Sequence, residues 1–196
     1  MQLKPFIQIN EDIGLHLARP ELAPAIFNAI DSQRDYLREW LPWVDATTCL
    51  KNTEEFIKES QQHNTNGTRL TTFITIGEQL VGSIGVVTFN KDNKSCEIGY
   101  WLHQGFQGQG IATKTCHALI SHLFKTKSLN RIEIKVAVGN NKSQAVPIRL
   151  GFTKEGVLRQ GLLLYGNFHD LVLFSLLRQE WPVGIGSKKG YRKKLF

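Results

Sequence analysis

The sequence contains no long apolar run, no internal repeat and few cysteines. Its apolar stretches, such as Leu162–Tyr165 and Leu171–Phe174, are much shorter than the roughly 18 residues that a membrane-spanning helix needs. No apolar segment of signal-peptide length follows the N-terminus. Cys49, Cys96 and Cys116 form no C-x-x-C pair, which argues against a disulfide framework or a zinc site. We therefore expect a cytoplasmic protein that makes no membrane contact.

Basic and acidic residues are nearly balanced except at one end of the chain. The formal net charge is +7, from 24 Lys and Arg against 17 Asp and Glu. Residues 183–196 contain five of the basic residues and no acidic one, so the rest of the chain has 19 basic and 17 acidic residues. We interpret 183–196 as a solvated, disordered basic tail. The alternative is a weak, salt-sensitive contact with the ribosome or RNA through phosphate charge.

The length and composition fit one domain, which we place at residues 1–182. The 196 residues are 41% hydrophobic and 10% aromatic, as is typical of a folded domain. Helical spacing and capping signals predict four helices: Glu21–Asp31, Asn52 to about Gln62, one that starts after Gly110, and Asn141–Leu150. Alternation and turn signals predict seven strands: Gly14–Arg19, Thr71–Ile76, Leu80–Phe89, Ser95–Leu102, Arg131–Val138, Glu155–Tyr165 and Phe168–Leu177, the last two joined by a turn at Gly166-Asn167. The pattern indicates a mixed α+β fold with a largely antiparallel sheet.

A glycine-rich turn separates the strand Ser95–Leu102 from the next helix. It contains Gly105, Gly108 and Gly110. Glycines at a helix N-terminus expose main-chain N–H groups, which together with the helix dipole favour an anion. The order G-x-x-G-x-G matches neither the dinucleotide fingerprint nor the P-loop. The residues therefore predict a phosphate-binding turn, with a purely structural turn as the alternative.

Several segments in sequence order carry a family resemblance. Gln107-x-x-Gly110-x-Ala112 resembles the Q/R-x-x-G-x-G/A signature of the GNAT superfamily of N-acetyltransferases. Glu97–Leu102 is similar to that superfamily's fourth strand, and Asn140-x-x-Ser143 and Leu150-Gly151-Phe152 follow in the right order.

Two further segments narrow the resemblance to one branch. Trp40-Leu41-Pro42-Trp43 and Asp170-Leu171-Val172 resemble the RimJ/RimL-like ribosomal-protein N-terminal acetyltransferases, and the likeness extends over about residues 5–181. Gly105-Phe106 departs from the Pro and Trp that are common in this branch. The resemblance implies a GNAT-like central sheet of about seven strands with helices on both faces.

The resemblance also implies a co-substrate, acetyl-CoA, and no metal. The six histidines show no metal-ligand spacing. The pyrophosphate is expected on the turn before the helix, and the pantetheine arm beside the fourth strand and the N-x-x-S turn. The residues expected to bind acetyl-CoA are Leu102, Gln107, Gly108, Gln109, Gly110, Ile111, Ala112, Thr113 and Asn140.

Two residues are candidates for catalysis. By resemblance, Ser143 is the hydrogen-bond donor to the departing thiolate, and its structural alternative is a helix N-cap. Glu97 is the candidate base, since a neutral amine must attack, and its alternative is an exposed acid paired with a lysine such as Lys94. Cys116 is expected in the core, so no acyl-enzyme is expected.

Fewer residues are candidates for contact with the acceptor amine. By resemblance, Trp40 and Trp43 wall the acceptor channel, with core packing as the alternative. For Asp170, a structural role in a turn is favoured over contact with an acceptor amine.

The sequence thus predicts an N-acetyltransferase that acts on an amine, and the N-terminal α-amine of a ribosomal protein is the favoured acceptor. The alternatives are acetylation of a small amine (a polyamine, amino sugar or antibiotic) and a non-catalytic CoA-binding module. A homodimer is left open.

Overall fold

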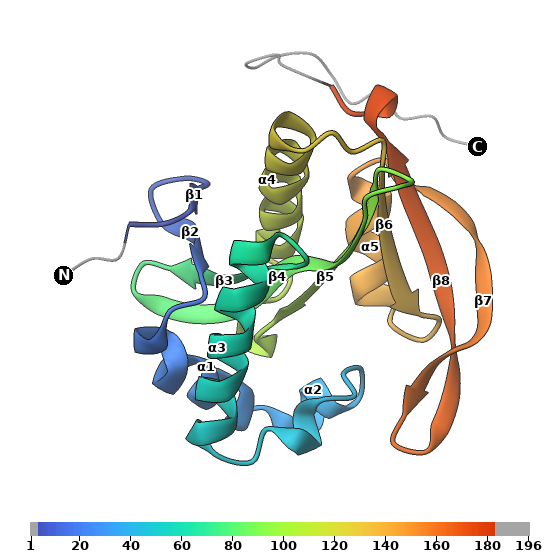
Figure 1. Cartoon of the computed structure of the whole chain (residues 1–196). Helices are drawn as coiled ribbons and strands as arrows, with labels where there is room; N and C mark the ends of the chain where they lie inside the picture. The colour runs from blue at the N-terminus through green and yellow to red at the C-terminus, as the bar shows by residue number, and fades with distance from the viewer. Residues whose placement is uncertain (1–3, 183–196) are drawn as a thin grey trace.

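One eight-stranded sheet organises the molecule, in the order β1-β2-β3-β4-β5-β6-β8-β7 (Figure 1). The computed structural model describes residues 4–182. The strands are β1 (Ile7–Gln8), β2 (Ile13–Leu17), β3 (Leu70–Ile76), β4 (Gln79–Asn90), β5 (Ser95–Leu102), β6 (Arg131–Ala137), β7 (Thr153–Leu164) and β8 (Asn167–Leu177). Neighbouring strands are antiparallel except β5 and β6, which are parallel. The predicted mixed, largely antiparallel fold is confirmed.

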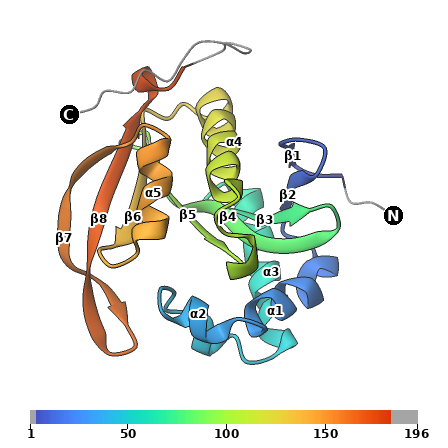
Figure 2. The same ribbon diagram turned by 180° about the vertical axis from the view of Figure 1, so that it is seen from behind.

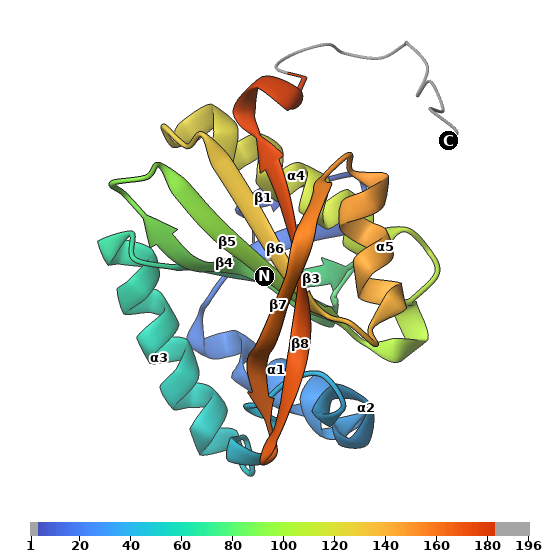
Figure 3. The ribbon, with the colours of Figure 1, turned by 90° about the vertical axis from the view of Figure 1, so that its right-hand side faces the viewer.

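Helices cover both faces of this sheet, and Figure 3 shows α3 and α5 on opposite sides of the strands. The helices are α1 (Ala23–Asp31), α2 (Arg34–Arg38), α3 (Leu50–Asn66), α4 (Ile111–Thr126) and α5 (Asn141–Arg149), with short 3-10 turns η1 (Pro20–Leu22), η2 (Val44–Ala46), η3 (Gln104–Phe106) and η4 (Arg178–Glu180). One core cluster contains residues of α4 and α5, which Figure 2 shows side by side, and the other contains residues of α1, α2 and α3. Within residues 4–182, no helix has the length and apolarity needed to cross a membrane.

The apolar spacing of α4 explains its position. Cys116, Leu119, Ile120 and Leu123 recur at helical spacing, and all four are fully buried against the sheet. In β6, Ile132, Ile134 and Val136 are buried while the charged residues between them are partly exposed. These periodicities fix which face of each element meets the core, and they hold the N-terminus of α4 beside the end of β5.

The structure departs from the local predictions at several places, including the ends of some helices and strands. The two-residue strand β1 makes an eighth strand, and the short helix α2 has no counterpart in the prediction. The helix predicted from Asn52 begins at Leu50, because Cys49 is its N-cap and the Asn52 side chain accepts the Cys49 N–H at 3.1 Å. The hairpin turn lies at Tyr165-Gly166 rather than Gly166-Asn167, and both residues have positive φ (47° and 84°). The predicted tail, 183–196, lies outside the described residues.

The ladder between β5 and β6 is short. It joins only Ser95–Glu97 to Arg131–Glu133, although β5 continues to Leu102 and β6 to Ala137. Beyond the third residue pair the two strands are no longer hydrogen-bonded to each other. This opening in the sheet positions the candidate site.

Candidate active site

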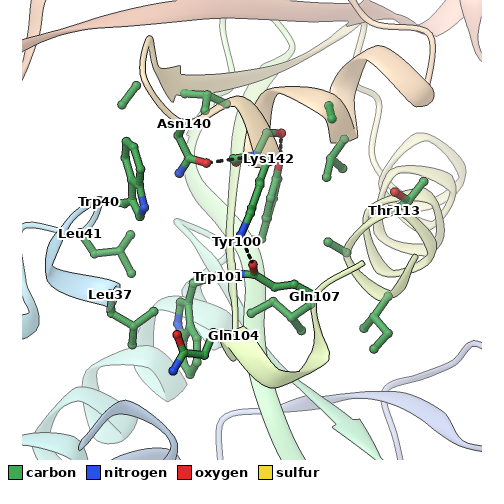
Figure 4. A pocket seen from close by; sticks show the side chains of 18 of the residues that line it. Leu37, Trp40, Leu41, Tyr100, Trp101, Gln104, Gln107, Thr113, Asn140 and Lys142 are labelled. Carbon is green, nitrogen blue, oxygen red and sulfur yellow. Dashed lines mark hydrogen bonds between the residues drawn. The ribbon is translucent and has the colours of Figure 1, made fainter. Parts of the chain in front are cut away.

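A cavity of about 1150 Å³ lies where β5 and β6 part. Its walls come from α2 and the loop after it, from β5 and β6, from the turn before α4, from α5 and from the β7–β8 hairpin. Figure 4 shows Trp40 and Leu41 on one side of the cavity, Thr113 of α4 on the other, and Tyr100 and Gln107 between them. The predicted motifs are therefore gathered around one space.

The glycine-rich turn exposes the N-terminus of α4 to this cavity. Gly108 and Gly110 have φ of 77° and 75°, a left-handed conformation that glycine adopts readily. The main-chain N–H of Lys114 donates the first helical hydrogen bond, to the Gly110 carbonyl at 2.9 Å. The N–H groups of 111–113 therefore have no acceptor within the helix. A Cβ atom at Gly108 or Gly110 would meet no protein atom within 4 Å. The space before these amides is open to an anion.

The charges around the cavity favour the same kind of ligand. Lys114, Lys135, Lys142 and Arg149 line it, and Glu97 is the one acidic residue of the lining within the described chain. A pyrophosphate brings several negative charges, which these cations and the α4 dipole would offset. The donor set therefore fits a phosphate-bearing co-substrate.

The residues predicted to bind acetyl-CoA lie around the cavity, with one exception. All except Gln109 line it. The exposed Gln109 side chain is turned back toward the Gly105 carbonyl, at 3.4 Å. Gln107 donates to the Tyr36 hydroxyl and accepts from Lys142 Nζ at 3.2 Å, so its side chain connects α2 with α5. Gln107 thus braces two walls of the cavity.

Ser143 lies in the first turn of α5 and contacts β5. Its Oγ donates to the Tyr100 hydroxyl at 3.1 Å, and the Tyr100 hydroxyl donates to the Ser143 carbonyl at 2.8 Å. Burial raises the pKa of Tyr100, so this hydroxyl stays protonated at neutral pH. The helix cap is Asn140, whose side chain accepts the Ser143 N–H at 3.0 Å, so the alternative of Ser143 as an N-cap is wrong.

Glu97 lines the cavity but is not a free carboxylate. Lys135 Nζ lies 2.7 Å from its Oε2, and both side chains are partly buried. The partner is therefore Lys135 of the adjacent strand rather than the predicted Lys94. Its role as the base stays a prediction.

The two tryptophans have different positions. Trp40 lines the cavity, and its ring lies near Gly139. Trp43 is not part of the lining but packs against the cluster of α1–α3, with its ring centroid 6.4 Å from that of Trp101. The position of Trp43 agrees with core packing, the alternative to a substrate contact.

Two other residues have structural positions. Asp170 accepts the main-chain N–H of Gln160 at 2.8 Å, where the β7–β8 register shifts, so the favoured structural role fits. Cys116 is fully buried, and burial raises the pKa of its thiol. Within the described part of the chain, no three His, Cys, Asp or Glu residues form a group that could hold a metal.

Sequence reasoning missed Tyr100 and the cations of the lining. One available signal was Pro147, which has no N–H to bond the carbonyl four residues earlier, that of Ser143. A donor from elsewhere was therefore to be expected, and it is Tyr100.

Residues 12–153 match the acetyltransferase (GNAT) domain family. The chain is 36% identical to a putative ribosomal N-acetyltransferase, YdaF, of Bacillus subtilis (strain 168), over 89% of this chain and 96% of that protein. It is 30% identical to the ribosomal-protein-serine acetyltransferase of Escherichia coli (strain K12), over 86% of this chain and 94% of that protein.

Solved structures agree with these relatives. RimL, a ribosomal L7/L12 α-N-protein acetyltransferase in complex with coenzyme A, has a TM-score of 0.85 and 27% identity, covering 89% of this chain and 98% of that one. The microcin C7 self-immunity acetyltransferase MccE, in complex with acetyl-CoA and AMP, has a TM-score of 0.85 and 30% identity, covering 87% and 95%. The chain belongs to the acetyltransferase (GNAT) domain family and is an N-acetyltransferase that uses acetyl-CoA.

Proposed function

We propose that this enzyme acetylates the N-terminal α-amine of a ribosomal protein. The observation that carries the proposal is that one cavity joins the free amides at the N-terminus of α4, a partly buried pair of hydroxyls and an apolar wall. The names of the relatives support the acceptor class.

The chain offers a place for each part of the co-substrate. The amides of 111–113, with Lys114, Lys142 and Arg149 nearby, would hold the phosphates. Leu102 and Asn140, on either side of the opening in the sheet, would flank the pantetheine arm. Acetyl-CoA supplies a thioester whose acetyl group passes to the acceptor amine as the thiolate departs.

Ser143 and Tyr100 act together in this proposal. The Ser143 Oγ–H, now directed to Tyr100, turns to the departing sulfur and stabilises its negative charge. Tyr100 remains hydrogen-bonded to the Ser143 carbonyl and keeps the first turn of α5 against β5. Ser143 is therefore the catalytic residue and Tyr100 its positioning residue.

Glu97 is the proposed base, acting directly or through water. A free α-amine has a pKa of about 8, so only mild assistance is needed to obtain its neutral form, whereas a lysine amine near 10.4 needs more. Lys135 keeps the Glu97 carboxylate at the edge of the cavity.

The acceptor is proposed to enter between Trp40 and Leu41 on one side and Leu162 and Leu171 of the hairpin on the other. The hairpin is fixed to the loop after α2, because the Tyr165 hydroxyl donates to the Leu41 carbonyl at 2.8 Å. An amine on a small antibiotic is the second candidate acceptor, favoured by the likeness to MccE.

A panel of acceptors tests the proposal. N-terminal peptides of ribosomal proteins, polyamines and aminoglycosides would be compared by kcat/KM, with release of free thiol as the readout. We expect the peptides to be preferred, and peptides with a blocked α-amine but a free lysine to be inactive. Preference for a small amine would replace the ribosomal acceptor, and no turnover with any acceptor would favour a CoA-binding module.

We also propose a cellular location and a dimer contact for this enzyme. A cytoplasmic location fits a ribosomal acceptor. A homodimer would have a natural contact at β7, an edge strand on which Val157 and Leu158 are exposed. Light scattering of the purified protein would decide between monomer and dimer.

A further inference from the structure

A second hollow surface lies at the opposite end of α4 from the active site. It encloses about 440 Å³ and is bordered by four exposed cations, Lys94, Lys125, Lys127 and Arg178. We call these four residues the basic patch. The 16 residues of α4 make it about 24 Å long, so the patch is remote from the glycine-rich turn.

Three segments of the chain meet in the basic patch. Lys94 comes from the β4–β5 turn, Lys125 and Lys127 from the end of α4, and Arg178 from η4. In Figure 1 these segments lie together at the upper end of the molecule, away from α2 at the lower end. Main-chain hydrogen bonds join them, because Asn130 N–H donates to Lys94 O at 2.7 Å and Arg178 N–H donates to Asn130 O at 2.8 Å. The cations therefore stand on a fixed main chain.

The charges of the patch are not neutralised by the described residues. None of the four cations forms an ion pair within residues 4–182. The lining contains no acidic residue, and the nearest acids along the chain are Asp92 and Glu180. Glu180 accepts the Leu177 N–H at 2.8 Å. Burial, Lys127 and Lys125 all lower the pKa of nearby His122, which agrees with a positive potential.

The net charge of the whole chain is concentrated here and in the residues that follow. The patch has four of the 24 basic residues, and residues 183–196 have five more with no acid. The other 15 basic residues are outnumbered by the 17 acidic ones. Trp181, just before the basic tail, is held on α4 by its Nε1–H bond to Ser121 Oγ at 3.3 Å. The last described residues of the chain therefore lie close to the patch.

Stabilisation of the C-terminus of α4 explains the positions of only some cations of the basic patch. Arg178 donates to the Phe124 carbonyl, and cations at the end of a helix offset its dipole. Lys94 belongs to another element and makes no such contact with α4, so dipole compensation does not account for its position.

We propose that the basic patch binds the phosphate backbone of RNA. Separate cations around a shallow hollow suit successive phosphates, which give salt-dependent binding without base recognition. An anionic membrane is disfavoured because none of the exposed large apolar side chains borders the patch, and surface binding to lipid usually adds apolar insertion. The inference does not depend on the identity of the acceptor, although a ribosomal acceptor would place the enzyme beside RNA.

Binding of a fluorescein-labelled, mixed-sequence single-stranded RNA to the full chain tests this proposal. Affinity is measured by anisotropy over a range of KCl concentrations for the wild type and for Lys94→Gln/Lys127→Gln. We expect the slope of log K against log salt to fall by about 1.4, since each phosphate contact contributes about 0.7. The affinity near 0.1 M salt should fall on the order of tenfold.

A matched control is Lys51→Gln/Lys58→Gln on α3, which removes the same charge from two exposed lysines elsewhere. This control should keep most of the affinity, and both variants should acetylate a peptide acceptor like the wild type. Equal losses of RNA affinity in both variants would show that only the net charge matters and would overturn the proposal. An RNA affinity of Lys94→Gln/Lys127→Gln equal to that of the wild type would also overturn it. Stronger binding to anionic vesicles or polyglutamate than to RNA, lost in the same variant, would assign the patch to another partner. None of these outcomes affects the acetyltransferase assignment.

Discussion

The hydroxyl of Tyr100 meets both polar groups of Ser143, donating to its carbonyl at 2.8 Å and accepting from its Oγ at 3.1 Å. The contact joins β5 to the first turn of α5. The carbonyl is available because its usual helical partner is residue 147, a proline without an N–H. The proline that weakens the helix thus allows the contact that positions its serine.

Replacing Ser143 by alanine should lower kcat with little change in the affinity for acetyl-CoA. The Oγ acts only when charge develops on sulfur, and loss of one such donor costs about 10²–10³-fold. Steady-state kinetics with an N-terminal peptide, together with calorimetric titration of acetyl-CoA, would measure both quantities. An unchanged kcat would leave Ser143 with a structural role alone.

A double-mutant cycle should reveal the coupling between Tyr100 and Pro147. Tyr100→Phe removes the donor to the Ser143 carbonyl and should cost about 1–2 kcal/mol of unfolding free energy. Pro147→Ala restores the missing N–H, so it should recover about 1 kcal/mol more in the Tyr100→Phe background than in the wild type. Urea unfolding of the four proteins measures this, and strictly additive changes would contradict the proposed link.

Replacing Gly110 by valine should severely weaken acetyl-CoA binding. A side chain there would project into the open space before the α4 amides, at a φ of 75° that valine resists. Gly77→Val is the control, since Gly77 also has a positive φ (57°) and open surroundings but lies in the β3–β4 turn. Equal affinity in a folded Gly110→Val protein would show that the phosphates bind elsewhere.

Glu97→Gln should reduce the rate most at low pH, where the acceptor amine is protonated. Activity should partly recover as the pH approaches the pKa of the amine, about 8 for an α-amine. A pH–rate profile with a matched N-terminal peptide tests this expectation.

Lys135→Gln distinguishes a role of Glu97 as the base from its role as the ion-pair partner of Lys135. It breaks the same ion pair but leaves the carboxylate in place. If Glu97 is the base, Lys135→Gln should not reproduce the pH-dependent loss. An equal loss at every pH for Glu97→Gln would instead assign proton removal to water.

Glu155 should make stability depend on pH in the acid range. Arg131 and Ser175 lower the pKa of Glu155 from 4.5 to about 2. The stabilisation from a lowered carboxylate pKa is present above about pH 4.5 and is lost as the pH falls toward 2. Glu155→Gln should therefore lower the unfolding free energy at pH 7, by no more than about 1 kcal/mol because the pair is partly exposed.

Urea unfolding at pH 7 and near pH 2 would measure the Glu155 effect. The difference from the wild type should shrink at the lower pH. Glu54→Gln, on an exposed position of α3, is the control and should show no such trend.

The fold was predictable where a periodicity extends over several residues. β6 alternates over its whole length, and the buried residues of α4 recur at helical spacing. β1 has only two residues, Ile7 and Gln8, and is a strand because β2 pairs with it. The start of α3 was misplaced because Asn52 is typical of an N-cap but acts here from the third position of the helix.

The site was predictable where one segment carries the geometry. The positive φ values at Gly108 and Gly110 are a local property that the glycines themselves indicate. The pairing of Glu97 with Lys135 depends on the register between β5 and β6. The different positions of Trp40 and Trp43 depend on which of the two side chains packs against the core cluster of α1–α3. Such relationships between distant segments leave no periodic signal in the sequence.

The short ladder between β5 and β6 divides the sheet mechanically. Three residue pairs are the seam between a half-sheet of five strands and one of three. The seam lies at one end of both strands, so a small change of angle there would be magnified at the far end, where the cavity opens. Side-chain volume at Cys96 and Ile132, which face each other across the seam and are buried, would thus set the width of a cleft that neither residue lines.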